Sequence, residues 1–360
     1  MRISIILGTR PEIIKMSPII RELENRNLDY FILHTGQHYS YNLDKIFFKD
    51  LELPLPKYNA DVGSGTHAEE TGRMLIAIEK ILQKDKVDVV LVEGDTNTVL
   101  AGALAAVKLH VLIGHVEAGL RSYDREMPEE INRILTDHIS NYLFAPTDLA
   151  EQNLIKEGIS KDKIFITGNT ITDAVYQNLE ISKKKVDILD KLNLSSKKYF
   201  LVTVHRQENV DRIEQLEGIF KGLELIYNEF KYPLIYPIHP RAMKRISEFG
   251  LEIPKGVRLV DPIGFLEFLQ LEAGACLVLT DSGGVQEETC ILKVPCVTLR
   301  NNTERPETLQ VGSNILAGTN KEEIFKGAKI MLDKENNWDS PFGYGNAGKK
   351  TIEILEDNLK

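Results

Sequence analysis

Short apolar runs alternate with amphipathic stretches along most of this 360-residue chain, and this alternation limits its fold more than any other feature. The apolar runs are nearly continuous, as expected for parallel strands that helices cover on both faces. Repeated strand–helix units predict the α/β class with doubly wound parallel sheets. The expected strands are residues 3–7, 30–34, 87–92, 111–115, 142–145, 164–167, 199–204, 234–237, 257–260, 276–280 and 295–299. The main expected helices are residues 11–25, 66–84, 96–109, 129–140, 214–229, 285–292 and 321–334.

The length of the chain predicts two domains, because a single core rarely grows to this size. The strand–helix alternation breaks at residues 178–198, which are rich in Lys, Asp and Ser, so the domain change is expected near residues 168–198. We expect a Rossmann-like domain over residues 1–170, a second over 171–350, and a final helix over 351–360 that can pack back on the first. Two such domains facing each other would form a central cleft at the carboxyl ends of both sheets.

Composition excludes several classes of protein. A net charge of −9 argues against a nucleic-acid binder, which would normally be basic. Three cysteines without a Cys-x-x-Cys spacing suggest neither a disulfide framework nor a zinc site. The sequence shows no signal-peptide pattern and no apolar run of bilayer length, so we expect a cytoplasmic protein without a membrane partner.

Two strand–glycine–helix junctions point to anion binding. One is Asp281-Ser282-Gly283-Gly284, directly after an apolar run, and the other is Gly8-Thr9-Arg10 near the start of the chain. Glycine lets the backbone approach an anion, and a helix N-terminus offers free N–H groups. An ordinary tight turn would also use these glycines, but a junction of this kind in each half favours a phosphate ligand. No dinucleotide fingerprint or P-loop motif is present, which disfavours hydride transfer and P-loop nucleotide hydrolysis.

Carboxylates follow the expected strands of the first half. Asp95 and Glu117 each come after a strand, and Glu129 begins a helix. Asp95 could simply cap a helix, and Glu129 suits a first helical turn. Three carboxylates on one rim favour proton transfer instead. No His-rich or Asp-x-Asp spacing supports a metal site.

Cationic side chains follow strands of the second half. His205 and Arg206 are adjacent, and His239 and Arg305 also come after expected strands. Their positions favour contact with an anion, although Arg305 could equally form a surface ion pair with a neighbouring glutamate.

Eight motifs in order along the chain resemble those of the non-hydrolysing UDP-N-acetylglucosamine 2-epimerases. They are Gly8-Thr9-Arg10-Pro11-Glu12, Gly94-Asp95-Thr96, the segment from Gly114 to Arg121, Pro128-Glu129-Glu130-Ile131-Asn132-Arg133, Gly168-Asn169-Thr170, the segment from Val204 to Asn209, the segment from Asp281 to Glu288, and Thr303-Glu304-Arg305-Pro306-Glu307. Any one of these would be weak, but the ordered set spans nearly the whole chain.

The resemblance implies a GT-B-like fold, a homodimer, and a reaction without cofactor or metal. It implies interconversion of UDP-GlcNAc and UDP-ManNAc by inversion at C2, through elimination of UDP to 2-acetamidoglucal and re-addition, for surface polysaccharide or glycan synthesis. The catalytic residues implied are Asp95, Glu117, Glu129 and His205. The implied substrate contacts are Arg10, Lys15, His205, Arg206, His239, Phe268 near the uracil, Ser282, Gly283, Gly284, Glu288 at the ribose, and Arg305.

Several alternatives stay open at this point. Either two carboxylates serve the two faces of C2, or the glucal moves between the two steps. Glu130 competes with Glu129 for the third acidic position. Control by UDP-GlcNAc as an effector, considered for residues 35–39 and 61–65, is a further open question. The rival functions are a glycosyltransferase of the same fold, a hydrolysing 2-epimerase and a non-catalytic sugar-nucleotide sensor.

Overall fold

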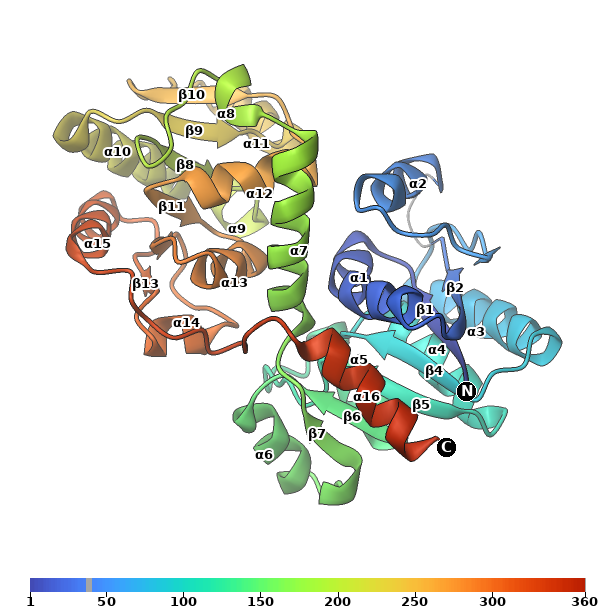
Figure 1. Cartoon of the computed structure of the whole chain (residues 1–360). Helices are drawn as coiled ribbons and strands as arrows, with labels where there is room; N and C mark the ends of the chain where they lie inside the picture. The colour runs from blue at the N-terminus through green and yellow to red at the C-terminus, as the bar shows by residue number, and fades with distance from the viewer. Residues whose placement is uncertain (37–40, 360) are drawn as a thin grey trace. The chain divides into compact units, whose positions relative to one another are not determined.

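The structure is a computed structural model that describes residues 1–36 and 41–359, with the side chains of residues 41–44 outside the description. Residues 37–39, considered for an effector, therefore lie outside the described residues. The chain divides into two compact units, with Met1–Gln177 and Phe342–Lys360 in unit 1 and Asn178–Pro341 in unit 2 (Figure 1). Each unit contains one parallel sheet with helices around it, which confirms the predicted α/β fold class.

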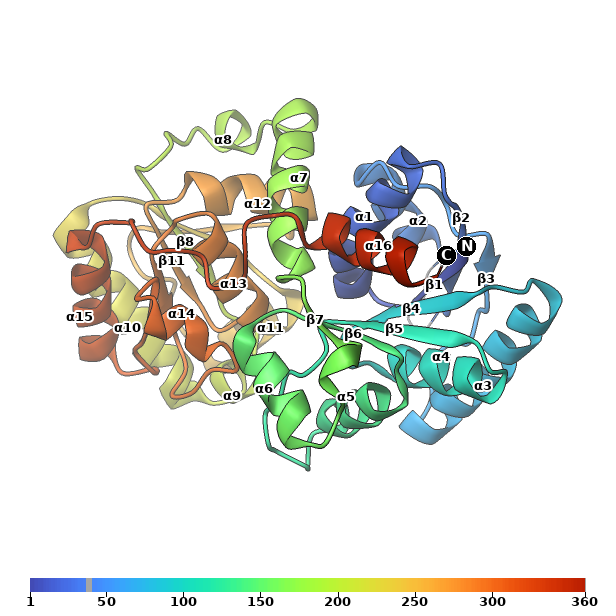
Figure 2. The same cartoon turned by 60° about the horizontal axis from the view of Figure 1, so that its bottom comes forward.

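Unit 1 is built on a seven-stranded parallel sheet of order β3-β2-β1-β4-β5-β6-β7. Figure 2 shows α1 and α16 on one side of this sheet and α3, α4 and α5 on the other. The strands are β1 (Arg2–Leu7), β2 (Asp29–His34), β3 (Tyr58–Asn59), β4 (Val89–Glu93), β5 (Leu112–Val116), β6 (Tyr142–Ala145) and β7 (Ile164–Ile166). The helices are α1 (Arg10–Asn25), α2 (Tyr41–Asp50), α3 (His67–Lys84), α4 (Asn97–Lys108), α5 (Pro128–Ile139), α6 (Asp148–Lys156), η1 (Lys161–Lys163) and α16 (Ala347–Asn358).

Unit 2 is built on a six-stranded parallel sheet of order β10-β9-β8-β11-β12-β13. Its strands are β8 (Phe200–Thr203), β9 (Leu234–Pro237), β10 (Val257–Val260), β11 (Leu277–Thr280), β12 (Cys296–Thr298) and β13 (Asn314–Leu316). Its helices are α8 (Ile188–Lys191), α9 (Gln207–Val210), α10 (Ile213–Phe230), α11 (Pro240–Phe249), α12 (Phe265–Gly274), α13 (Gly283–Ile291), α14 (Pro306–Gln310) and α15 (Lys321–Asp333). Helix α7 (Thr170–Lys185) begins in unit 1 and ends in unit 2.

Alternation along each strand builds two core layers in unit 2. Phe200 and Val202 pack with the apolar residues of α10 and α15. Tyr199 and Leu201 pack on the other face, with Leu271 of α12. Successive side chains of a strand point to opposite faces, so an unbroken apolar run can feed both layers.

All eleven expected strands are present, and their ends lie within two residues of the expected positions. The structure adds β3 and β13, which are too short to stand out as apolar runs. The lysine-rich run at residues 183–185 is the last turn of α7, where cations are favoured by the negative end of the helix dipole. Within residues 1–36 and 41–359, no helix combines the length and apolar character needed to cross a membrane.

The last helix, α16, completes unit 1 from the far end of the chain. It packs along α1, as both views show (Figures 1 and 2). The carboxylate of Asp173 accepts the backbone N–H groups of Ala347 and Gly348, each at 3.1 Å, and so satisfies the free end of the helix. Arg26 of α1 forms ion pairs with Glu353 and Glu356 of α16.

Candidate active site

The predicted site residues gather where the strand order of each sheet reverses. These points lie between β1 and β4 in unit 1 and between β8 and β11 in unit 2. Ligands of doubly wound sheets bind beside such points, at the carboxyl ends of the strands. Arg10 and Asp95 follow β1 and β4, while His205 and Asp281 follow β8 and β11. Each unit therefore has its own cluster of candidate residues, and the two clusters are described separately below.

The turn after β1 is shaped by Gly8 and held by Glu12. A Cβ atom at Gly8 would collide with the hydroxyl oxygens of Thr35 and Thr98, so only glycine fits there. The buried Glu12 carboxyl accepts the N–H of Gly8 at 2.5 Å and that of Thr9 at 2.8 Å. Burial raises the pKa of Glu12 from 4.5 to about 7, against the lowering effect of these donors and of Thr96. Glu12 thus fixes the start of α1, the helix that carries Arg10 and Lys15.

Lys15 lies among acidic side chains at the carboxyl edge of the sheet. Its Nζ is ion-paired with Glu117 and lies 3.3 Å from Oε1 of Glu93, the last residue of β4. Burial raises the pKa of Glu93, and the negative charges of Glu117 and Glu12 raise it further against the opposing effect of Lys15. Glu117 also has a left-handed backbone, with φ of 68°, which is uncommon for a residue other than glycine and is found where structure enforces it. The fold therefore holds Glu117 against Lys15 in a constrained geometry.

Asp95 and the two competing glutamates of α5 have different environments. Asp95 is about one-third exposed and ion-paired with Arg133. Glu130 is buried and accepts the N–H groups of Ser122 and Tyr123, each at 2.9 Å. Burial opposes ionisation of Glu130, but these bonds and Arg133 outweigh it and lower the pKa of Glu130. Glu129 is half-buried.

These contacts separate the two glutamates by role. The Glu130 carboxylate holds the loop that precedes α5. The side chain of Glu129, in contrast, makes no hydrogen bond or ion pair with the described residues 1–36 and 41–359. Glu129 is therefore the better placed of the two to meet a substrate.

The glycine turn of unit 2 leaves space that the protein itself does not fill. A Cβ atom at Gly284 would meet nothing within 4 Å, and one at Gly283 only the Glu304 carboxylate at 3.7 Å. Neither glycine has a positive φ, so backbone strain does not explain them. Ser282 is the N-cap of α13 and makes no capping bond with its side chain. The open backbone and the first N–H groups of α13 form the kind of surface that binds phosphate.

Asp281 lies beneath this turn and orients His205. The carboxylate is fully buried and accepts the backbone N–H of Arg206 at 2.9 Å and an amide N–H of Asn209 at 3.1 Å. One of its oxygens lies 3.1 Å from Nδ1 of His205, whose side chain is 48% exposed. Burial opposes ionisation of Asp281, but His205 and the backbone donors outweigh it and lower the pKa of Asp281. With Nδ1 facing Asp281, the other ring nitrogen of the half-exposed His205 is the one available to a ligand.

Arginines surround the same turn, each matched by a glutamate. Arg305 lies 2.7 Å from Glu287, and Arg206 lies 3.6 Å from Glu304. Arg300 forms two hydrogen bonds of 2.8 Å with Glu304 and lowers the pKa of Glu304 to about 2. Such pairs hold the guanidinium groups in fixed positions, where an incoming diphosphate would find planar donors.

The remaining predicted residues of unit 2 have partners of their own. Phe268 is half-buried against the core layer that contains Tyr199. Nδ1 of His239 accepts the N–H of Arg241 at 3.2 Å and caps α11. Glu288 is 9% exposed and interacts with Glu272, which is fully buried. Burial raises the pKa of Glu272, and the nearby Glu288 raises it further.

Sequence reasoning singled out no role for Glu12, Glu93, Asp281 or Arg133. Glu12 could have been found from Thr9-x-x-Glu12, the capping-box spacing. Arg133 lies four residues after Glu129 on one helix, a spacing that places two residues on the same face. No spacing in the sequence indicates the role of Glu93 or the burial of Asp281, because both depend on how neighbouring strands pair. In the described part of the chain, no group of three or more His, Cys, Asp or Glu residues is arranged to hold a metal.

The protein has two parallel α/β units. One carries carboxylates around a lysine, and the other has a glycine turn at the start of a helix. These features define a class of proteins with the GT-B-like fold that act on nucleotide-linked substrates. Comparison with known proteins specifies the family. The model of the family "UDP-N-acetylglucosamine 2-epimerase" matches residues 21–356, and the chain belongs to this family.

Two curated relatives and one solved structure illustrate the similarity. The UDP-N-acetylglucosamine 2-epimerase of Methanocaldococcus jannaschii is 59% identical over 99% of both chains. That of Methanococcus maripaludis is 56% identical over 98% of both chains. The crystal structure of the M. jannaschii enzyme in complex with UDP-GlcNAc and UDP has a TM-score of 0.86 at 59% identity, covering 99% of this chain and 100% of that one.

Proposed function

We propose that this protein interconverts UDP-GlcNAc and UDP-ManNAc by inverting C2 of the sugar. The observation that carries the proposal is the array of acidic side chains at the carboxyl edge of the first sheet, where Glu117 is held against Lys15 and Asp95 against Arg133. Family membership supports the substrate, since a relative 59% identical over its whole length is solved with UDP-GlcNAc and UDP.

The proposed reaction has two half-steps that balance in protons and electrons. A carboxylate takes the C2 proton, the C2–H electron pair forms the C1–C2 double bond, and the C1–O bond breaks with its pair leaving on UDP. UDP then adds back to C1 of the 2-acetamidoglucal while a proton is delivered to the opposite face of C2. Asp95, Glu117 and Glu129 are the proposed proton-transfer groups. Cations stabilise the charge that develops on the departing diphosphate.

Unit 2 is proposed to bind the nucleotide. The open glycines Gly283 and Gly284 and the start of α13 suit the diphosphate, with His205 acting in catalysis and binding. The other proposed substrate contacts are Arg10, Lys15, Arg206, His239, Phe268, Ser282, Glu288 at the ribose, and Arg305. The reaction would then need residues of a domain covering 1–170 and of a second covering 171–350.

The proposal extends to the protein's assembly and place in the cell. Within it, the enzyme acts as a cytoplasmic homodimer and supplies UDP-ManNAc for surface polysaccharide or glycan synthesis. Light scattering of the purified protein tests the dimer, because a monomer at working concentration would refute it.

Incubation with UDP-GlcNAc alone in deuterated water, followed by NMR, tests the reaction. UDP-ManNAc carrying deuterium at C2 is the expected product. Free ManNAc with UDP would indicate a hydrolysing epimerase, and turnover only after adding a sugar acceptor would indicate a glycosyltransferase. No product at all would indicate a sugar-nucleotide sensor, and UDP-ManNAc that kept its original hydrogen would exclude the carboxylates as bases.

A further inference from the structure

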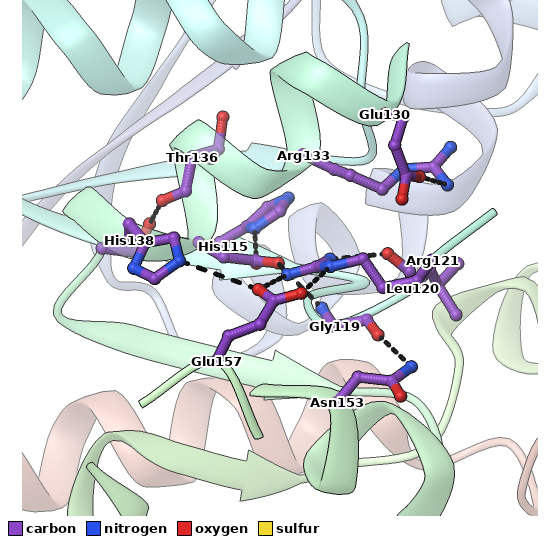
Figure 3. A network of polar contacts seen from close by, with 12 residues as sticks. His115, Gly119, Leu120, Arg121, Glu130, Arg133, Thr136, His138, Asn153 and Glu157 are labelled. Atoms are coloured by element: carbon purple, nitrogen blue, oxygen red, sulfur yellow. Dashed lines mark hydrogen bonds and ion pairs between the residues drawn. The ribbon is translucent and has the colours of Figure 1, made fainter. Parts of the chain in front are cut away.

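A fully buried histidine of unit 1 joins the two turns that carry Asp95 and Glu117. His115, on β5, is 0% exposed. Its Nδ1 lies 2.6 Å from Oδ1 of Asp137 on α5, and its Nε2 lies 2.8 Å from the carbonyl oxygen of Gly94. Figure 3 shows His115 within a larger network of polar contacts. Neither His115 nor Asp137 has a part in the proton transfers proposed above.

The partners of His115 occupy both of its ring nitrogens. The carbonyl of Gly94 has no proton to give and can only accept a hydrogen bond, so Nε2 of His115 is the donor in that contact. The second oxygen of Asp137 accepts the N–H of Gly119 at 3.2 Å and lies 2.7 Å from the Arg121 guanidinium. Nδ1 of His115 faces the first oxygen of Asp137, so the ring is held between the Gly94 carbonyl and the Asp137 carboxyl group.

The charged side chains around His115 are paired with one another. Asp137 and His138 come from α5, Arg121 from the loop after β5, and Glu157 from the end of α6. Arg121 forms hydrogen bonds of 2.7 and 2.6 Å with the two Glu157 oxygens, and His138 lies 3.7 Å from Glu157 (Figure 3). The buried Arg121 guanidinium therefore has carboxyl groups of Asp137 and Glu157 as partners, as a buried charge requires.

Both turns held by this pair have backbone conformations that need support. Gly94, directly before Asp95, has φ of 84°, and its carbonyl accepts from His115. Glu117 has φ of 68° and Gly119 φ of 84°, and the Gly119 N–H donates to Asp137. A left-handed backbone is unfavourable for a residue other than glycine, so Glu117 keeps its position because its neighbours are fixed.

We propose that His115 and Asp137 are positioning residues that hold Asp95 and Glu117 in register for proton transfer. The ring of His115 holds the Gly94–Asp95 turn through the Gly94 carbonyl. The Asp137 side chain holds the Glu117–Gly119 turn through the Gly119 N–H, and the contact between His115 and Asp137 joins the two turns. The inference rests on the proposed function for its catalytic consequence, but the pair itself is a property of the fold.

Kinetics of three variants test the catalytic part. His115→Gln and Asp137→Asn should each lower kcat by about 10²-fold, because a displacement of about 1 Å at the reacting groups has that effect. KM for UDP-GlcNAc should change less than about threefold in both variants. His138→Asn is the matched control, since His138 is adjacent to Asp137 on α5 but its ring lies beside Glu157, and it should keep full activity. Native-state hydrogen exchange of the β1 amides shows that unit 1 of each variant is folded, and unchanged kcat in folded His115→Gln and Asp137→Asn would overturn the catalytic role.

Two measurements without turnover test the pair itself. Nitrogen-15 NMR of the unaltered protein should show a proton on Nε2 of His115, and an Nε2 without a proton would overturn the assignment. Amide hydrogen exchange at Gly119 should speed up at least tenfold in Asp137→Asn and stay unchanged in His138→Asn. If the unaltered protein makes no UDP-ManNAc, the proposed function fails, whereas these two readouts still decide whether the pair exists.

Discussion

Replacing Glu12 by Gln should remove a pH dependence from the stability of unit 1. Burial raises the pKa of Glu12 from 4.5 to about 7, so the folded protein favours the neutral carboxyl. Its stabilising contribution is complete below pH 4.5 and is lost as the pH rises through 7. Over the whole interval the loss is about 3.4 kcal/mol, of which ~2.5 kcal/mol falls between pH 5 and pH 8.

The overall stability of the variant is not the diagnostic quantity. The amide of Gln presents one acceptor oxygen to the N–H groups of Gly8 and Thr9 and the hydroxyl of Thr96, so the replacement also adds a change in stability that does not depend on pH. What should change is the slope of its unfolding free energy against pH. Because the other titrating groups are shared, subtracting the two pH profiles isolates Glu12.

The assay must report on unit 1. The single tryptophan, Trp338, belongs to unit 2, so its fluorescence can miss the relevant transition when the units unfold separately. Native-state hydrogen exchange of the β1 amides between pH 5 and pH 8, corrected for intrinsic exchange, reports the unfolding free energy of the correct sheet. Glu224→Gln, at an exposed position of α10, is the control. Parallel pH profiles for the unaltered protein and Glu12→Gln would refute the argument.

Three further outcomes are expected. Asp95→Asn, Glu117→Gln and Glu129→Gln should each lower kcat by about 10²-fold or more with UDP affinity little changed, and a variant with normal steady-state turnover would remove its residue from the mechanism. Asp281→Asn should lower kcat/KM by about tenfold or more, because His205 loses the carboxylate that orients it. NMR of the His205 ring should show a changed tautomer, and an unchanged tautomer would contradict this role of Asp281. Gly284→Ala should weaken UDP binding by about tenfold without altering the thermal midpoint, because the added methyl meets only ligand space, and equal affinity by calorimetry would place the diphosphate elsewhere.

The sheets could be predicted because parallel strands buried on both faces leave an unbroken apolar signal. Phe200 and Tyr199 enter opposite core layers, and both kinds of position are apolar in the sequence. Strands β3 and β13 have two and three residues and sit at the edges of their sheets, so their formation depends on pairing that no local pattern records.

For the site, the sequence predicted only which residues lie at the ends of strands. Asp95 and Glu117 were expected on one rim because each follows a strand, and the structure places them after β4 and β5. Their ion-pair partners come from helices α5 and α1. Likewise, Asp281 reads in the sequence as part of a phosphate turn, while its carboxylate is buried and faces His205. Such partners depend on tertiary packing, which sequence spacing does not encode.

The return of α16 to unit 1 has a consequence for biosynthesis. Unit 1 is formed from both ends of the chain, whereas unit 2 is one continuous segment between them. Domains usually complete folding in the order of their synthesis. Here, residues 1–177 can complete their unit only after residues 342–360, which follow unit 2, have been made. Until α16 leaves the ribosome, the face of α1 that it covers and the Asp173 carboxylate that receives it lack their partner. A nascent chain stalled before residue 347 should therefore hold a finished unit 2 beside an unfinished unit 1, which is the state that a chaperone would meet.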